Sequence, residues 1–184
     1  MAALVVAALA QIGDRTPWLA AILAERYRRP GVVIAMAGVA LLAAGALAVV
    51  AGMLLAPMLA PRAQDVLLGL ALILQGGGAL FPAKAPARLT GWRTGAALTS
   101  LLGLFILAFG DGIQFVVVAL SARSSLPWAA AIGATLGSLA VVTVAVTLGE
   151  ASWQRLPLAR LRLTVGIVLL VAGLAIGLHG IGLI

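Results

Sequence analysis

The sequence predicts an all-α integral membrane protein with six transmembrane helices, arranged as two inverted-topology three-helix repeats. Three observations lead to this fold class: the apolar composition, a series of apolar segments long enough to cross a bilayer, and a similarity between the two halves of the chain. Of the 184 residues, 64% are hydrophobic and only 9% are charged. Soluble domains are about half apolar and about a quarter charged, so the composition is typical of a chain embedded in lipid.

Apolar segments account for nearly all of the sequence. A helix needs about 20 apolar residues to cross the hydrocarbon core, so six such helices with short loops leave no room for a soluble domain. The first segment has no basic stretch before it, and we expect it to be a retained helix and not a cleaved signal peptide. The six predicted helices span residues 2–24, 31–56, 65–81, 95–121 and 128–149, and the stretch from residue 163 to the C-terminus.

The two halves of the chain match when the sequence is shifted by 97 residues, the offset that carries Asp14 onto Asp111. Asp, Arg and Pro are rare in this chain, so matches between them carry the argument. The same offset also pairs Arg26 with Arg123 and Pro30 with Pro127. We expect one repeat at residues 1–81, a cytoplasmic linker at 82–94 and a second repeat at 95–184. Each repeat has three helices, so the second enters the membrane from the opposite side, as in many secondary transporters.

The basic residues predict the orientation of the helices. Two of them, Arg62 and Arg123, fall on one side of the predicted membrane, whereas nine fall on the other. These nine lie in the loops between helices 1–2, 3–4 and 5–6, and they are Arg26, Arg28, Arg29, Lys84, Arg88, Arg93, Arg155, Arg160 and Arg162. Cytoplasmic loops are rich in Lys and Arg, so both termini are expected to face away from the cytoplasm. This distribution also explains the net charge of +7 without a nucleic-acid partner.

A polar break interrupts the first apolar segment at Gln11-Ile-Gly-Asp-Arg-Thr16, and a similar break, Phe109-Gly-Asp-Gly-Ile-Gln114, interrupts the fourth. Ionisable groups near the middle of a membrane helix cost about 2.5–3.5 kcal/mol, so they are candidates for a functional site. Pseudo-symmetry would bring the first and fourth helices together at the bilayer midplane. Asp14 and Asp111 would then face each other as ligands of a metal ion.

The neighbouring residues supply further oxygen ligands, which hard cations prefer. Gln11, Thr16 and Gln114 offer amide and hydroxyl oxygens. Gly13 and Gly110 would let another backbone approach closely. Pro17 has no N–H to donate to the Gly13 carbonyl, so it frees that oxygen for an ion, unless it simply kinks the helix. Arg15 is expected to be the charge partner of this site.

These residues resemble a motif of the six-helix manganese/calcium-proton exchangers of bacteria, chloroplasts and the Golgi, within the lysine-exporter superfamily. That family carries Glu-x-Gly-Asp-Lys/Arg-Thr/Ser on its first and fourth helices, inside two inverted repeats. The resemblance covers nearly the full chain, including Arg26-Tyr27 and the Gly133-Ala-Thr135 stretch. It implies a secondary transporter in a bacterial inner (plasma) membrane that exports a divalent cation in exchange for protons, with Mn²⁺ as first choice and Ca²⁺ as second.

The sequence departs from the family motif at several positions. Gln11 and Ala108 replace the two glutamates, and Gly112 and Ile113 replace the basic and hydroxyl residues of the second copy. The resemblance implies four carboxylates and two basic residues in the family site, which together match a divalent cation. Asp14, Asp111 and Arg15 sum to one negative charge, so a divalent ion is expected to bind more weakly here.

Three functions remain open from the sequence. The first is a divalent-cation/proton exchanger with a reduced site, in which two aspartates exchange two protons for one ion. The second is a related transporter of a different cation or small solute, and the third is a transport-inactive partner subunit. A homodimer, or pairing with a homologue, would change the charge of the site. The sequence shows no nucleophile–base pair of the kind that would predict an enzyme. No resident cofactor is expected.

Overall fold

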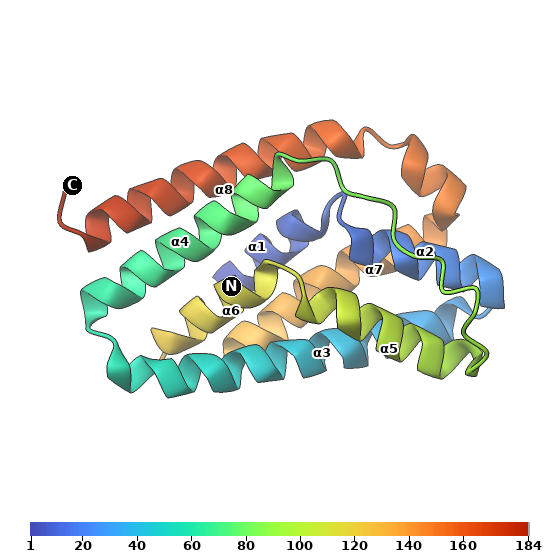
Figure 1. Ribbon diagram of the computed structural model, residues 1–184, viewed down its shortest axis with the longest axis horizontal. Coiled ribbons are helices and arrows are strands. Elements are labelled where there is room, and N and C mark those ends of the chain that lie inside the picture. Colours follow the sequence, from blue (N-terminus) through green and yellow to red (C-terminus); the bar gives the residue numbers. More distant parts are fainter. Residues whose placement is uncertain (184) are drawn as a thin grey trace.

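The computed structural model describes residues 1–183, and every regular element in this range is helical (Figure 1). Ile184, the last residue of the predicted second repeat, lies outside the described residues. The helices are α1 (Ala2–Gln11), α2 (Arg15–Tyr27), α3 (Pro30–Leu55), the short 3₁₀ helix η1 (Ala56–Met58), α4 (Pro61–Ala79), α5 (Gly95–Phe109), α6 (Ile113–Ala122), α7 (Trp128–Arg155) and α8 (Leu158–Gly180).

Three helical segments are long and apolar enough to cross a membrane: Pro30–Met58, Trp128–Arg155 and Leu158–Gly180. A fourth appears if α5 and α6, which are bent by 67° at their junction, are taken as one broken span. The helix α1 is apolar but shorter. The prediction of an all-helical membrane protein agrees with these features, whereas the crossing of the membrane by six helices stays a prediction.

The first and fourth predicted helices are each broken, so the expectation that they run unbroken over residues 2–24 and 95–121 was wrong. The first break covers residues 12–14 and the second covers residues 110–112. Gly13 has φ +74°, a conformation that L side chains rarely adopt and that ends an α-helix. The helix α2 therefore starts anew, with Asp14 as its N-cap and Pro17 in its first turn.

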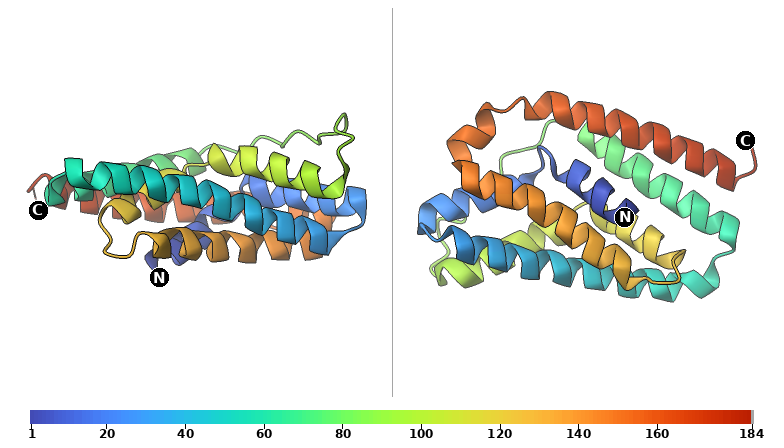
Figure 2. Two further views of the ribbon diagram at one scale, coloured as in Figure 1. Left: turned by 90° about the horizontal axis from the view of Figure 1, so that it is seen from below. Right: turned by 180° about the vertical axis from the view of Figure 1, so that it is seen from behind.

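The outer surface of the molecule is apolar, and its core is built from small residues. Large aliphatic and aromatic side chains are exposed along the outside of the long helices, including Leu42, Val50, Leu74, Val144 and Val171. The interior holds many alanines, including Ala20, Ala37, Ala40, Ala131 and Ala145. Small residues let membrane helices approach closely, while large apolar ones face lipid tails. Figure 2 shows that these helices pack as a bundle elongated along the helix axes.

The helices α4 and α8 run antiparallel along one edge of the molecule (Figure 1) and touch through glycines. Gly69 of α4 lies against Gly173 of α8, and Gly76 lies against Gly166. The 97-residue offset exchanges these two contacts, because it carries Gly69 onto Gly166 and Gly76 onto Gly173. The packing of α1 on α7 is likewise matched by that of α5 on α3. The two halves of the chain therefore contact each other in a pseudo-two-fold manner.

Candidate ion-binding site

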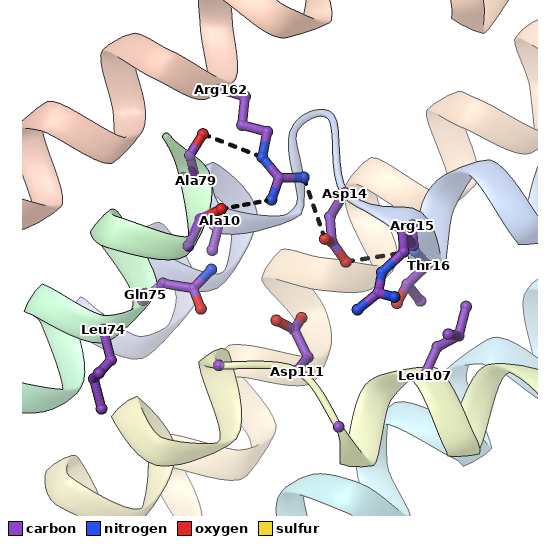
Figure 3. A pocket seen from close by; sticks show the side chains of 13 residues that line it. Ala10, Asp14, Arg15, Thr16, Leu74, Gln75, Ala79, Leu107, Asp111 and Arg162 are labelled. Carbon is purple, nitrogen blue, oxygen red and sulfur yellow. Dashed lines mark hydrogen bonds and ion pairs between the residues drawn. The ribbon is translucent and has the colours of Figure 1, made fainter. Parts of the chain in front are cut away.

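A pocket of about 210 Å³ lies where the two helix breaks meet (Figure 3). Asp14 lines it from the first break and Asp111 lines it from the second. The two aspartates that the sequence predicted to face each other therefore share one pocket. Its other polar side chains are Arg15, Thr16, Gln75 and Arg162.

Both aspartates are held in the same way by the helix that follows them. The Asp14 carboxylate accepts a hydrogen bond from the Thr16 amide at 3.4 Å, and Asp111 accepts one from the Ile113 amide at 3.5 Å. The 97-residue offset carries Thr16 onto Ile113, so the two hydrogen bonds are pseudo-equivalent, although Asp14 is the N-cap of α2 whereas Asp111 directly precedes the N-cap of α6. The first amides of a helix have no intrahelical acceptor and carry a partial positive charge, which favours a carboxylate at this position.

Gln11 joins the two breaks directly. Its Nε2 donates to Asp111 Oδ2 at 3.1 Å, so the last residue of α1 binds the carboxylate of the second break. Gln11 and Thr16 are both fully buried. Gln11 Oε1, Thr16 Oγ1 and Gln114 Oε1 have no hydrogen-bond partner in the described part of the chain. A buried oxygen without a partner costs free energy, so these atoms are suited to bind a ligand or water.

The backbone oxygen beside Asp14 is bound by an arginine that the sequence did not place in the site. Arg162 Nη1 donates to the Gly13 carbonyl at 3.0 Å and lies 3.6 Å from Asp14 Oδ1. Pro17 does leave the Gly13 carbonyl without a helix hydrogen bond, but Arg162 occupies that oxygen in this structure. The assignment of Arg162 to a loop is wrong, because α8 begins at Leu158 and carries Arg162 in its first turns.

The other predicted residues lie at or near this pocket. Gly110 lines it, whereas Gly13 lines a neighbouring pocket. Gln114 lies on α6, outside the lining of the pocket. Gln75 of α4 does line it, with its Oε1 directly over the α carbon of Gly112, in the space that a β carbon would occupy. Gly112 has ordinary helical dihedral angles, so the absence of its side chain serves to leave room for the Gln75 amide.

Comparison with known proteins assigns the chain to a family. The family model of the divalent cation/proton antiporter GDT1 matches residues 1–87 and 96–182. The chain belongs to this family. It is also 34% identical to a protein of Vibrio cholerae serotype O1 that bears the name "Putative manganese exporter", over 168 residues that cover 90% of this chain and 84% of that protein. No solved structure matches the chain.

Membership in the antiporter family confirms the resemblance drawn from the two Gly-Asp breaks. Members of this family move cations across membranes, so the protein is a transporter and not an enzyme. The family and the apolar helices together make it an integral membrane protein.

The charge of the pocket differs from the charge that the sequence predicted for it. Asp14 and Asp111 supply two negative charges, and Arg15 and Arg162 supply two positive ones. The pocket is therefore formally neutral, whereas the sequence predicted one net negative charge. No cluster of three or more His, Cys, Asp or Glu side chains occurs among residues 1–183. Any cation held here would depend on backbone and amide oxygens in addition to the two carboxylates.

Proposed function

We propose that this protein is a secondary transporter that exchanges a divalent cation for protons at the pocket between the two helix breaks. Mn²⁺ is the first choice of cation and Ca²⁺ the second. The observation that carries the proposal is the presence of Asp14 and Asp111, which occupy equivalent positions in the two helix breaks, in one pocket. The family and the name of the Vibrio cholerae relative support the choice of cation.

The pocket offers the hard oxygen ligands that such cations prefer. Besides the two carboxylates, the Thr16 hydroxyl and the Gln75 amide line it. Two carboxylates balance the charge of one divalent cation, and two protons replace that cation on the same oxygens. Exchange of two protons for one cation would therefore leave the net charge of the loaded site, aspartates plus bound ions, the same in the two forms.

We further propose that the chain crosses a bacterial inner membrane six times as two inverted repeats, residues 1–81 and 95–184, joined by a cytoplasmic linker at 82–94. The exchange of the α4–α8 glycine contacts under the 97-residue offset supports this arrangement. Both termini would then lie away from the cytoplasm. Rocking of one repeat against the other around a fixed site would expose the aspartates to each side in turn.

A monovalent cation is a second candidate substrate, and the formal neutrality of the pocket favours it. A neutral pocket attracts a divalent ion less strongly than the negatively charged site of the family would. A competition assay distinguishes the two candidates by measuring how strongly Na⁺ or K⁺ inhibits the uptake of radioactive Mn²⁺. Weak inhibition indicates a site for a divalent ion, and strong inhibition indicates a site for a monovalent ion.

The experiment that tests the function is Mn²⁺ and Ca²⁺ uptake into proteoliposomes with simultaneous recording of internal pH. Wild type is compared with Asp14→Asn and Asp111→Asn, which keep the size of the side chain but cannot take up a proton or balance a cation. The matched control is Asp65→Asn, because Asp65 pairs with Arg123 at 2.9 Å outside the pocket lining. We expect coupled fluxes in wild type and Asp65→Asn and none in the other two variants. Folded wild-type protein without flux would refute cation/proton exchange by this chain alone.

A further inference from the structure

Arg162 connects three separate segments of the chain through one guanidinium group. Its Nη1 binds the Gly13 carbonyl and the Asp14 carboxylate at the first break. Its Nη2 donates to the Gly78 carbonyl at 3.0 Å, and its Nε donates to the Ala79 carbonyl at 3.3 Å. Figure 3 shows the side chain reaching from α8 toward Asp14.

Arg162 also stands between two pockets. The 210 Å³ pocket that holds both aspartates lies on one side, and a pocket of about 460 Å³ lies on the other. Asp14 and Arg162 line both. The larger pocket is bordered by Pro82 of the linker and by Gln154 near the end of α7. These are the segments that the basic residues assign to the cytoplasmic side, so Arg162 stands between Asp111 and that side, whereas Asp14 borders the larger pocket as well.

A cation and the guanidinium of Arg162 cannot both bind the Asp14 carboxylate at the same time. Both are positive, and both would bind the Asp14 carboxylate. The positive charge of Arg162 also neutralises the negative charge of Asp14, one of the two carboxylates that balance a divalent cation. Binding of the cation at full strength therefore requires that Arg162 leave these oxygens.

The contacts of Arg162 permit such a movement. Only Nη1 reaches the first break, whereas Nε and Nη2 bind carbonyls at the C-terminal end of α4. That end of a helix carries a partial negative charge, which holds a guanidinium favourably. Because the guanidinium is a rigid plane, turning Nη1 away from Gly13 also moves Nη2, whereas Nε, which joins the group to the rest of the side chain, can keep its hydrogen bond to the Ala79 carbonyl.

We propose that Arg162 is a tethered competitor of the transported cation: it occupies the Gly13 and Asp14 oxygens when the cation is absent, and the cation displaces it. The inference rests on the proposed function, because it assigns a specificity-determining residue to the same site. Arg162 thus lowers the affinity for the cation. Its departure opens the path between the two pockets, so binding of the cation and access to the larger pocket are coupled.

The competing explanation is that Arg162 only fastens α4 to the first break. The two roles predict opposite effects on the affinity for the cation. Removal of a competitor strengthens binding, since the pocket gains one net negative charge and two free oxygens. Removal of a structural contact loosens the break and weakens binding.

The test measures Mn²⁺ affinity by titration of purified protein, and the KM and maximal rate of Mn²⁺ uptake in proteoliposomes, for wild type, Arg162→Gln and Arg162→Lys. We expect Arg162→Gln to bind Mn²⁺ about tenfold or more tightly, since a unit charge is removed from a few ångströms away. Its uptake should show a lower KM together with a lower maximal rate. Lysine keeps the charge but lacks the planar fork that reaches all four oxygens. We therefore expect the Mn²⁺ affinity of Arg162→Lys to lie between that of wild type and that of Arg162→Gln. The matched control is Arg160→Gln, which removes an exposed arginine from the same helix and should leave the affinity unchanged.

The outcomes separate this inference from the proposed function. Absence of Mn²⁺ binding and flux in wild type would overturn the function. Wild-type binding together with equal or weaker binding in Arg162→Gln would overturn the competitor role alone. If Arg162→Gln does not fold, Arg162→Lys decides: tighter binding than wild type supports the role, and equal or weaker binding overturns it.

Discussion

The two aspartates occupy similar backbone positions but have different partners. Asp14 lies beside the guanidinium of Arg162, whereas Asp111 accepts a hydrogen bond from the neutral amide of Gln11. One carboxylate is therefore paired with a charge and the other with a dipole. The 97-residue offset explains the difference, because it carries Gln11 onto Ala108, which has no donor for Asp14, and Asp65 onto Arg162.

The substitution Gln11→Glu tests whether the Gln11 amide, which donates to Asp111, sets the affinity for the cation. The change removes the donor to Asp111 and adds a second acid beside it, at the position where the related exchangers carry a glutamate. We expect about tenfold tighter Mn²⁺ binding, because a buried pair of carboxylates attracts a divalent cation. Without Mn²⁺, the free energy of unfolding should fall by about 1–3 kcal/mol, because Asp111 loses a charge-assisted hydrogen bond. Titration with Mn²⁺ and denaturant unfolding in detergent measure the two effects.

Gln11→Met is the control for this substitution. Methionine is similar in size but donates no hydrogen bond and adds no charge, so it should lower stability without raising the affinity. Equal Mn²⁺ affinity in the two variants would show that residue 11 does not act on the cation.

At the level of the helices, α4 and α8 are held together by backbone contact. A β carbon placed on Gly173 would lie 2.7 Å from the Gly69 carbonyl oxygen and 2.8 Å from the Ile73 amide nitrogen. Backbone atoms cannot rotate away as a side chain can, so any larger residue must push the two helices apart. The close approach also brings the start of α8, and with it Arg162, next to the C-terminal end of α4.

Gly173→Ala should therefore destabilise the protein by about 1–3 kcal/mol, as expected for overpacking of a tight interface. Gly77→Ala is the matched control on α4, because nothing lies within 4 Å of the added β carbon. It should be neutral or should stabilise the helix by about 0.5–1 kcal/mol. Thermal unfolding in detergent, followed by circular dichroism, compares the two. Equal stability would mean that the glycine contact does not hold the pair together.

At the level of the whole molecule, the orientation in the membrane is a prediction that rests on the distribution of charge. The linker at 82–94 carries three basic residues, and the turn after α6 carries one. The chain contains no cysteine, so a single introduced cysteine is its only thiol. Ala87 in the linker and Ser124 in the turn are both exposed and lie on predicted opposite sides.

We expect Ala87→Cys to react with a membrane-impermeant maleimide only when the cytoplasmic face is accessible, as in inverted vesicles. Ser124→Cys should react in intact spheroplasts. The measurement is the labelled fraction of each variant in the two preparations. The reverse pattern would invert the orientation, and labelling of both variants from one side would contradict an inverted repeat.

The sequence predicted the helical class and the two sites of polar interruption well, because apolar length and rare repeated residues are local signals. It did not predict that the helices break there, although Gly13 and Pro17 both disfavour a continuous helix. The contribution of Arg162 could not be predicted from a local pattern, because 149 positions separate it from Gly13. A partial signal was present: Pro157 marks a helix start, which would place Arg162 in the helix instead of the loop.

The amide of Gln75 over Gly112 constrains how the second motif copy can change. Any side chain at position 112 would displace Gln75 Oε1 from its place in the pocket. Because this oxygen is the far end of a flexible side chain, Gln75 can turn aside, and a basic residue at position 112 would replace a neutral amide in the pocket by a positive charge. The size of residue 112 on one helix therefore decides whether the amide of another helix lines the ion pocket.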